Sequence, residues 1–175
     1  MQQARVEIAT ACVSQARRLV REEYLPRIER CLAQLSQQQI WWRPNEESNS
    51  IGNLVLHLAG NARQWIICGL GGAVDQRQRD QEFSQREELP GEELIRRLTE
   101  TLSEVDRVLT QLDLSRMLGV RQIQGLEVTT LEAVLHVTEH FSMHTGQIIL
   151  LTKLQTGKDL HFYDFEGGVP IKRWK

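Results

Sequence analysis

The sequence has little cysteine and no apolar run long enough to cross a membrane. Its three cysteines, Cys12, Cys31 and Cys68, are widely spaced, odd in number and without a Cys-x-x-Cys pair. This usage argues against a disulfide framework, so we interpret all three as small core or partly exposed thiols of a cytoplasmic protein. No stretch approaches the ~20 apolar residues of a membrane-spanning helix, and the N-terminal residues lack the apolar stretch of a signal peptide.

The sequence also lacks an excess of charge of either sign. Its 21 basic and 23 acidic residues give a formal net charge of -2, and the isoelectric point is about 6.2. Proteins that bind nucleic acid usually carry a concentrated basic surface, and this composition indicates none. We therefore expect no nucleic acid and no membrane as partner, and a small molecule as the substrate.

Internal repeats, low-complexity segments and strand patterns are lacking too, and the dominant pattern is helical. Four long segments carry apolar residues at mixed three- and four-residue spacing. Pro26 should kink or divide the first segment, Ser50 should cap the second, Pro90 should open the third, and the capping box Thr129-x-x-Glu132 should start the fourth. The segments are residues 4–35, 51–68, 90–112 and 129–157.

The connections between these segments complete the expected architecture. Residues 114–128 contain two glycines and indicate a loop with room for a short hairpin, and the tail from residue 160 onward has no clear periodicity. A polar, charged loop follows the second segment. Four helices with long second and third connections predict an all-α fold, a four-helix bundle with long connecting loops, in a single domain of residues 1–175.

Histidine is the residue type whose placement suggests chemistry. His136, His140 and His144 lie four residues apart, so they share one helix face, and two such imidazoles can reach one metal ion at about 2.0–2.1 Å. His57, in the second segment, would supply a third nitrogen. Three nitrogens leave open positions on the metal, as in catalytic sites. On the residues alone, an alternative stays open: two histidines four residues apart on a helix can be one buried and one solvated residue without a metal.

Several motifs accompany the histidines. They are Trp-Arg-Pro at residues 42–44, Asn-Leu-x-x-His-Leu-x-Gly-Asn at residues 53–61 and His-x3-His-x3-His-x-Gly-Gln at residues 136–147. With the long first helix, they make nearly the whole chain resemble the DinB/YfiT-like superfamily of metalloenzymes. The motifs are most similar to those of an uncharacterised branch of this superfamily, which carries Asn-Ser-Ile-Gly-Asn-Leu and His-x-x-Gly-Asn-x-x-Gln-Trp. In this chain they are residues 49–54 and 57–65.

The resemblance implies a divalent metal, zinc or nickel, held between the second and fourth helices by His57, His140 and His144. The Gly146-Gln147 pair sets the register and leaves His136 outside the ligand set. Distant relatives include bacillithiol S-transferases and a mycothiol-dependent maleylpyruvate isomerase, which use the metal to activate a low-molecular-weight thiol. We therefore expect an S-transferase-like enzyme, with a metal-dependent hydrolase or a non-catalytic metal-binding and dimerisation bundle as alternatives. The resemblance also implies a homodimer.

Four residues are candidates for a supporting role around the metal. Asn53 and Asn61 share the helix face of His57, Gln147 follows His144 by three residues, and His136 precedes His140 by one turn. Local capping is the alternative for Asn53, and a core hydrogen bond is the alternative for Gln147. No catalytic side chain is assigned. We interpret Arg77, Arg79 and Asp80 as part of a solvated loop, and Glu139 as directed away from the site.

Overall fold

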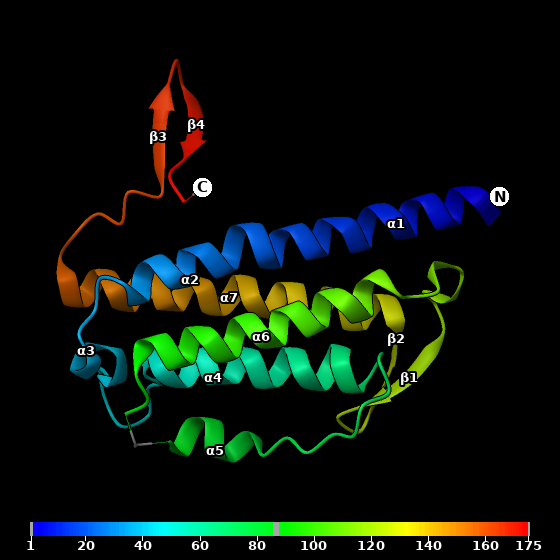
Figure 1. The fold of residues 1–175 in the computed structure, drawn as a ribbon, viewed down its shortest axis with the longest axis horizontal. Coiled ribbons are helices and arrows are strands. Elements are labelled where there is room, and N and C mark those ends of the chain that lie inside the picture. Colours follow the sequence, from blue (N-terminus) through cyan, green and yellow to red (C-terminus); the bar gives the residue numbers. More distant parts are fainter. Residues whose placement is uncertain (1, 86–87, 175) are drawn as a thin grey trace.

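The chain is built around four long helical rods that lie against one another (Figure 1). The computed structural model describes residues 2–85 and 88–174; residues 1 and 175, the ends of the expected domain, lie outside the described residues, as do residues 86–87. The first and second rods each contain a π-helical turn, whereas the third and fourth are single α-helices. In chain order the rods are α1 (Gln2–Arg18), η1 (Leu19–Tyr24) and α2 (Leu25–Leu32); α4 (Ile51–Ala62) and η2 (Arg63–Cys68); α6 (Gly91–Thr110); and α7 (Thr130–Thr156).

Shorter elements lie between the rods and after the last one, and they include strands. The fold is therefore mostly helical but not a clean four-helix bundle, which corrects the expectation of an all-α fold. Two antiparallel hairpins are present, β1 (Val120–Ile123) with β2 (Leu126–Thr129) and β3 (Tyr163–Glu166) with β4 (Val169–Lys172). The remaining short elements are α3 (Gln37–Trp41), α5 (Arg79–Ser84) and the 3-10 turn η3 (Leu114–Arg116).

Both hairpins turn at residues with positive φ. Gln124 and Gly125 have φ of 54° and 77°, and Gly167 and Gly168 have φ of 59° and 83°. Two-residue turns of this kind match the twist of antiparallel strands and favour glycine. The hairpin within residues 114–128 was predicted and is confirmed. The tail hairpin was not predicted, although Gly167-Gly168 was its sequence signal.

Local signals set the helix ends. Ser50 and Thr129 each cap a helix through a capping box, with Asn53 and Glu132 as the reciprocal partners. Gly157 ends α7 in the left-handed conformation with φ of 64°. These predicted boundaries are confirmed, and they place His57 two turns into α4.

Pro26 divides the first rod as predicted. It lies in the first turn of α2, and a π-helical turn directly precedes α2. Proline has no N–H to donate to the carbonyl of Glu22 four residues earlier. The indole N–H of Trp174 donates to that carbonyl oxygen at 2.8 Å. The tail is thereby attached to the rod at the point where the helical hydrogen-bond pattern is interrupted.

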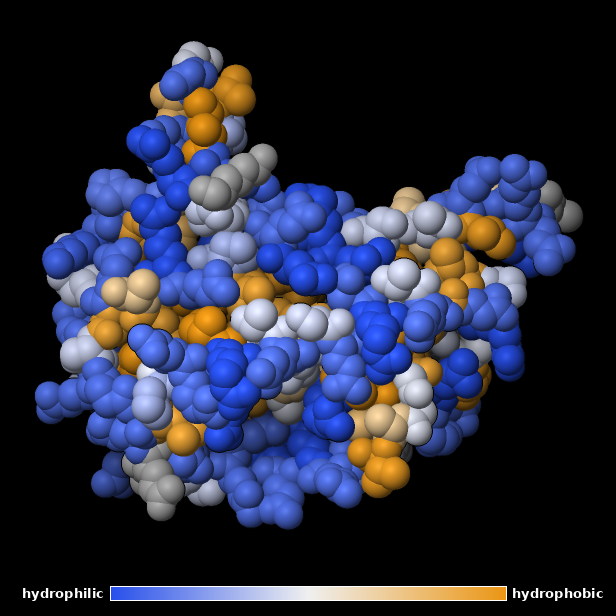
Figure 2. Space-filling model, in the orientation of Figure 1, coloured by the Kyte–Doolittle hydropathy of each residue, from blue (hydrophilic) through white to orange (hydrophobic). Residues whose placement is uncertain are grey.

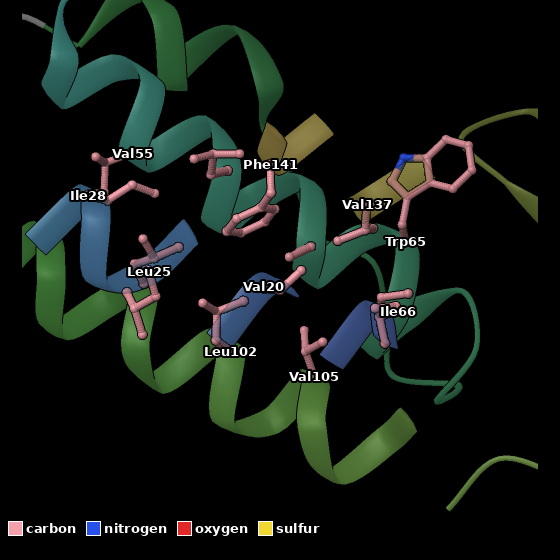
Figure 3. Packing of buried hydrophobic residues seen from close by; sticks show 14 of the residues in the cluster. Val20, Leu25, Ile28, Val55, Trp65, Ile66, Leu102, Val105, Val137 and Phe141 are labelled. Carbon is pink, nitrogen blue, oxygen red and sulfur yellow. The ribbon is translucent and has the colours of Figure 1, made fainter. Parts of the chain in front are cut away.

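The core packs between the rods, and Figure 3 shows the buried side chains that α4 and α7 contribute to it, among them Val55, Val137 and Phe141. Phe141 is fully buried, and Val137 lies one turn before it on the same helix face. Because Phe141 and Val137 point into the bundle, the adjacent face of α7 that carries His140 and His144 is brought to α4. The other rods contribute buried side chains to the same cluster, among them Val20, Leu25, Ile28, Val55, Trp65, Ile66, Leu102 and Val105.

The length of α7, 27 residues, would suffice for a membrane span, but the helix contains three histidines and several charged residues. Across the ranges 2–85 and 88–174, no helix combines the length and apolar character that a bilayer crossing requires.

Candidate metal centre

Three histidines meet between α4 and α7. His57 comes from α4, and His140 and His144 come from successive turns of α7. One ring nitrogen from each lies within 4.8 Å of the others, and the Nε2 atoms of His57 and His140 are 2.8 Å apart. His57 and His144 are buried, and His140 is partly exposed.

The spacing fits a metal ion. Nitrogens bound tetrahedrally to one zinc at 2.0–2.1 Å lie about 3.3 Å from each other. The observed separations bracket that value, so modest rotations of the three imidazoles would bring all of them to one ion. Over the described residues, no additional His, Cys, Asp or Glu joins this group. The donor set is therefore three nitrogens, which leaves a coordination position without a protein ligand.

The electrostatic environment keeps the two imidazoles of α7 in the form that binds metal. Burial lowers the pKa of His140 to about 3, and the neighbouring His144 and His57 contribute in the same direction. Burial also lowers the pKa of His144, although the hydrogen bond to Gln147 opposes the shift. Both rings are neutral near pH 7, so each has a nitrogen lone pair available for coordination.

A carboxylate contacts His57 at Nδ1, the ring nitrogen that does not face His140. The Nδ1 of His57 lies 2.9 Å from Oε2 of Glu82, which belongs to α5. Arg77 donates from Nε and Nη2 to the two oxygens of Glu82 at 2.7 Å and 2.8 Å. Burial opposes the ionisation of Glu82, but the hydrogen bonds from Arg77 and His57 outweigh it, and the pKa of the carboxyl is lowered.

The second histidine of α7 also has an outer partner. Nδ1 of His144 lies 2.6 Å from Oε1 of Gln147, one turn further along the helix. An amide oxygen accepts hydrogen bonds only, so Nδ1 donates and Nε2 of His144 is left for a metal. Gln147 thus lies where a residue that orients His144 would have to lie.

His136 lies outside the cluster. Its ring stacks on the indole of Trp65, with centroids 3.7 Å apart, and its Nε2 is 3.2 Å from Nδ2 of Asn61. Its centroid is 5.4 Å from that of His140. Asn61 shares the helix face of His57, but the side chain it contacts belongs to α7. Both residues pack beside the centre, outside the cluster of His57, His140 and His144.

Asn53 has a local role and a long-range one. Its side chain completes the capping box with Ser50, and its Nδ2 donates to the backbone carbonyl of Glu82 at 2.7 Å. The guanidinium of Arg43 donates to Oδ1 of Asn53 at 2.6 Å and to the carbonyl of Phe83 at 2.9 Å. The N-terminus of α4 is thereby attached to α5, which carries Glu82.

The residues that sequence reasoning missed are Glu82 and the role of Arg77. The segment was interpreted as a solvated loop, but the Arg77 side chain is only 6% exposed, and α5 occupies residues Arg79–Ser84. The available signal was Gly60, three residues after His57. A Cβ on Gly60 would lie 2.8 Å from Cδ of Glu82, so the glycine makes room for the carboxylate.

Comparison with protein families gives one match that extends over most of the chain. Residues 7–165 match DUF1572, a family described as proteins of unknown function, and DUF1572 is a DinB-like family. No curated protein matches the chain. Since the match extends over most of the chain and includes all three clustered histidines, the protein belongs to the DUF1572 family.

Proposed function

We propose that this protein is a metal-dependent enzyme in which His57, His140 and His144 hold one zinc or nickel ion. The observation that carries the proposal is a cluster of three imidazoles with no further protein ligand among the described residues. A structural zinc site is normally closed by four protein ligands, whereas a catalytic site keeps one position for water or substrate. The partial exposure of His140 supports access from solvent to that position.

The nucleophile that we propose is a low-molecular-weight thiol, and the reaction is an S-transfer to a small-molecule substrate. A dication at this centre would lower the pKa of a coordinated thiol, so that the nucleophilic thiolate is present near neutral pH. Resemblance to thiol-dependent enzymes supports this choice over water and hydrolysis. The ring of Phe83 lies 4.6 Å from that of His57, so an apolar side chain contacts one of the three proposed ligands. The homodimer that the resemblance implies stays a prediction.

Metal content tests the ligand set. We expect about one zinc or nickel per chain in tag-free protein, measured by plasma mass spectrometry after reconstitution and desalting. His57→Ala, His140→Ala and His144→Ala should each abolish stoichiometric binding, because each removes one of only three nitrogens. His136→Ala is the matched control from the same helix and should keep its metal. Equal loss in all four variants would show that the ligand assignment is wrong.

Absorption spectroscopy of nickel-loaded protein tests the nucleophile. Bacillithiol or mycothiol bound at the open position should add a thiolate-to-nickel charge-transfer band that saturates with one thiol per metal. His140→Ala, which lacks a ligand, should show no such band. Bound nickel without any thiol-dependent band would overturn the thiol assignment and favour water as the nucleophile.

A further inference from the structure

The contact between Glu82 and His57 has a consequence for the metal centre, provided that the proposed function holds. We propose that Glu82 is a positioning residue: its carboxylate fixes His57 in the tautomer with the proton on Nδ1, so that the lone pair of Nε2 faces the metal. Glu82 lies 25 residues from His57 in the chain, outside the motif that contains His57.

The two nitrogens of His57 face different groups. Nδ1 lies 2.9 Å from Oε2 of Glu82, and Nε2 lies 2.8 Å from Nε2 of His140. An ionised carboxylate has no hydrogen to donate, so the hydrogen bond at Nδ1 requires the proton to be on that nitrogen. A neutral imidazole carries one proton, and Nε2 is then an acceptor that faces His140 and can coordinate a metal.

Arg77 is the group that could reverse this arrangement. Its Nη2 is 3.1 Å from Nδ1 of His57, and a guanidinium can only donate. If Arg77 donated to Nδ1, the proton of His57 would move to Nε2 and block coordination. The same Nη2 is 2.8 Å from Oε2 of Glu82, and the ion pair offers it a charged acceptor at shorter distance. Nη2 carries two N–H groups, so the carboxylate disfavours donation to Nδ1 in another way: an unprotonated Nδ1 would place its lone pair against Oε2 of Glu82 at 2.9 Å.

The carboxylate is held rigidly in this place. Nη1 of Arg77 donates to Gln64 at 2.8 Å, and the backbone carbonyl of Glu82 accepts from Asn53 at 2.7 Å, so two separate positions on the second rod, in α4 and η2, hold the pair. The side chains of Arg77 and Glu82 are 6% and 12% exposed. Such buried partners of metal-binding histidines raise ligand basicity and hold the ring orientation, and their loss typically costs about 10–100-fold in metal affinity.

The experiment compares Glu82→Ala and Glu82→Gln with Asp80→Asn. Asp80 is an exposed carboxylate on the same helix, so its substitution removes a similar charge without touching His57. The tautomer of His57 is measured in metal-free protein by long-range proton–nitrogen NMR on histidine-labelled samples, assigned with the His57→Ala variant. Zinc affinity is measured by competition with a chromophoric chelator.

We expect the Nδ1–H tautomer in the wild type and in Asp80→Asn. In Glu82→Ala the proton should move to Nε2, because Arg77 is left as the neighbour of Nδ1, and zinc affinity should fall about 10–100-fold. Glu82→Gln keeps an acceptor oxygen and should keep the Nδ1–H tautomer with a smaller loss of affinity. This graded result separates positioning from a general structural effect, which would not move the tautomer.

Two outcomes would overturn the inference: an Nε2–H tautomer in the wild type, or unchanged tautomer and affinity in Glu82→Ala. If Glu82→Ala does not fold, the tautomer of His57 in the wild type and the tautomer and zinc affinity of Glu82→Gln still test the inference. The absence of zinc binding in the wild type would instead contradict the proposed function. Because the tautomer is read without metal, that failure is distinguishable from failure of the inference.

Discussion

At the scale of single residues, Gly60 shows how a missing side chain supports a site. Glycine inside a helix costs about 1 kcal/mol relative to alanine, so its presence in the last turn of α4, where the rod continues into η2, needs a reason. The reason is space, because a Cβ at this position would collide with the carboxylate of Glu82 and approach Nε of Arg77 at 3.1 Å. Gly60 therefore allows the ion pair to lie against the helix directly beside His57.

Gly60→Ala should separate fold stability from metal binding. The added methyl group meets the end of a side chain, so Glu82 can shift and the helix should still form. The shift moves the carboxylate off His57, and we expect zinc affinity to fall toward that of Glu82→Ala. Chelator competition and thermal unfolding measure the two effects.

Gly146→Ala is the matched control, because α7 also contains this glycine in its interior and its Cβ would meet nothing within 4 Å. Helix propensity predicts a gain of up to about 1 kcal/mol in unfolding free energy for this variant, with unchanged zinc affinity. Unchanged zinc affinity in Gly60→Ala would contradict the role of the glycine as space for Glu82.

At the scale of elements, the β3–β4 hairpin is an addition to the bundle, and an ion pair contributes to its attachment. It projects from the body in Figure 1, and Figure 2 shows apolar side chains on its exposed surface. A two-stranded hairpin is marginally stable by itself, so its attachment matters. Lys172 of β4 pairs with the buried carboxylate of Glu23, which also binds Arg18 and Arg27 on the first rod.

Glu23 should make the stability of the protein depend on pH. Burial opposes ionisation of its carboxyl, but Lys172, Arg18 and Arg27 outweigh this effect and lower the pKa below the ordinary value of 4.5. A lowered carboxyl pKa contributes stability that is complete above pH 4.5 and lost as the pH falls below it. Glu23→Gln lacks this contribution at every pH.

We therefore expect the melting temperature of the wild type to exceed that of Glu23→Gln at pH 7, and the difference to shrink as the pH is lowered from 4.5. Calorimetry of both proteins between pH 7 and pH 3 measures it. Glu22→Gln provides a control at the neighbouring position, since the contact of Glu22 with Trp174 uses its backbone carbonyl. A difference that stays constant with pH would show that the Glu23 ion pairs do not stabilise the fold.

At the scale of the whole molecule, the candidate metal centre connects two rods that are far apart in sequence. His57 and His140 are 83 residues apart, and the apolar packing of α4 against α7 is what brings them together. An ion bound to both helices is bound only by the folded chain. Metal binding and global stability are therefore linked.

Zinc or nickel should raise the melting temperature of the metal-free protein. A free metal concentration of 100 times Kd adds about 2.7 kcal/mol of unfolding free energy. For a chain of this size that corresponds to an increase of about 5–11 °C. Scanning calorimetry with and without metal measures the shift. His136→Ala should keep it and His144→Ala should lose it, whereas an equal shift in both variants would place the metal elsewhere.

Local chemistry made much of this protein predictable from its sequence. The capping boxes at Ser50 and Thr129, the division at Pro26 and the terminal Gly157 act between residues at most five positions apart, so the helices and their ends follow from neighbours in the chain. The four-residue spacing of His140 and His144 likewise determined that they share a face.

Only the tertiary structure decided which groups meet across the chain. The carboxylate of Glu82 reaches His57 because Asn53 and Arg43 hold α5 against α4, and no periodic pattern records that docking. The tail is held by the carboxylate of Glu23 and by the backbone carbonyl of Glu22, at separations of about 150 residues. Contacts of this kind depend on packing and burial of the whole chain. The histidines could therefore be identified from the sequence, whereas the groups that surround them were determined only by the tertiary structure.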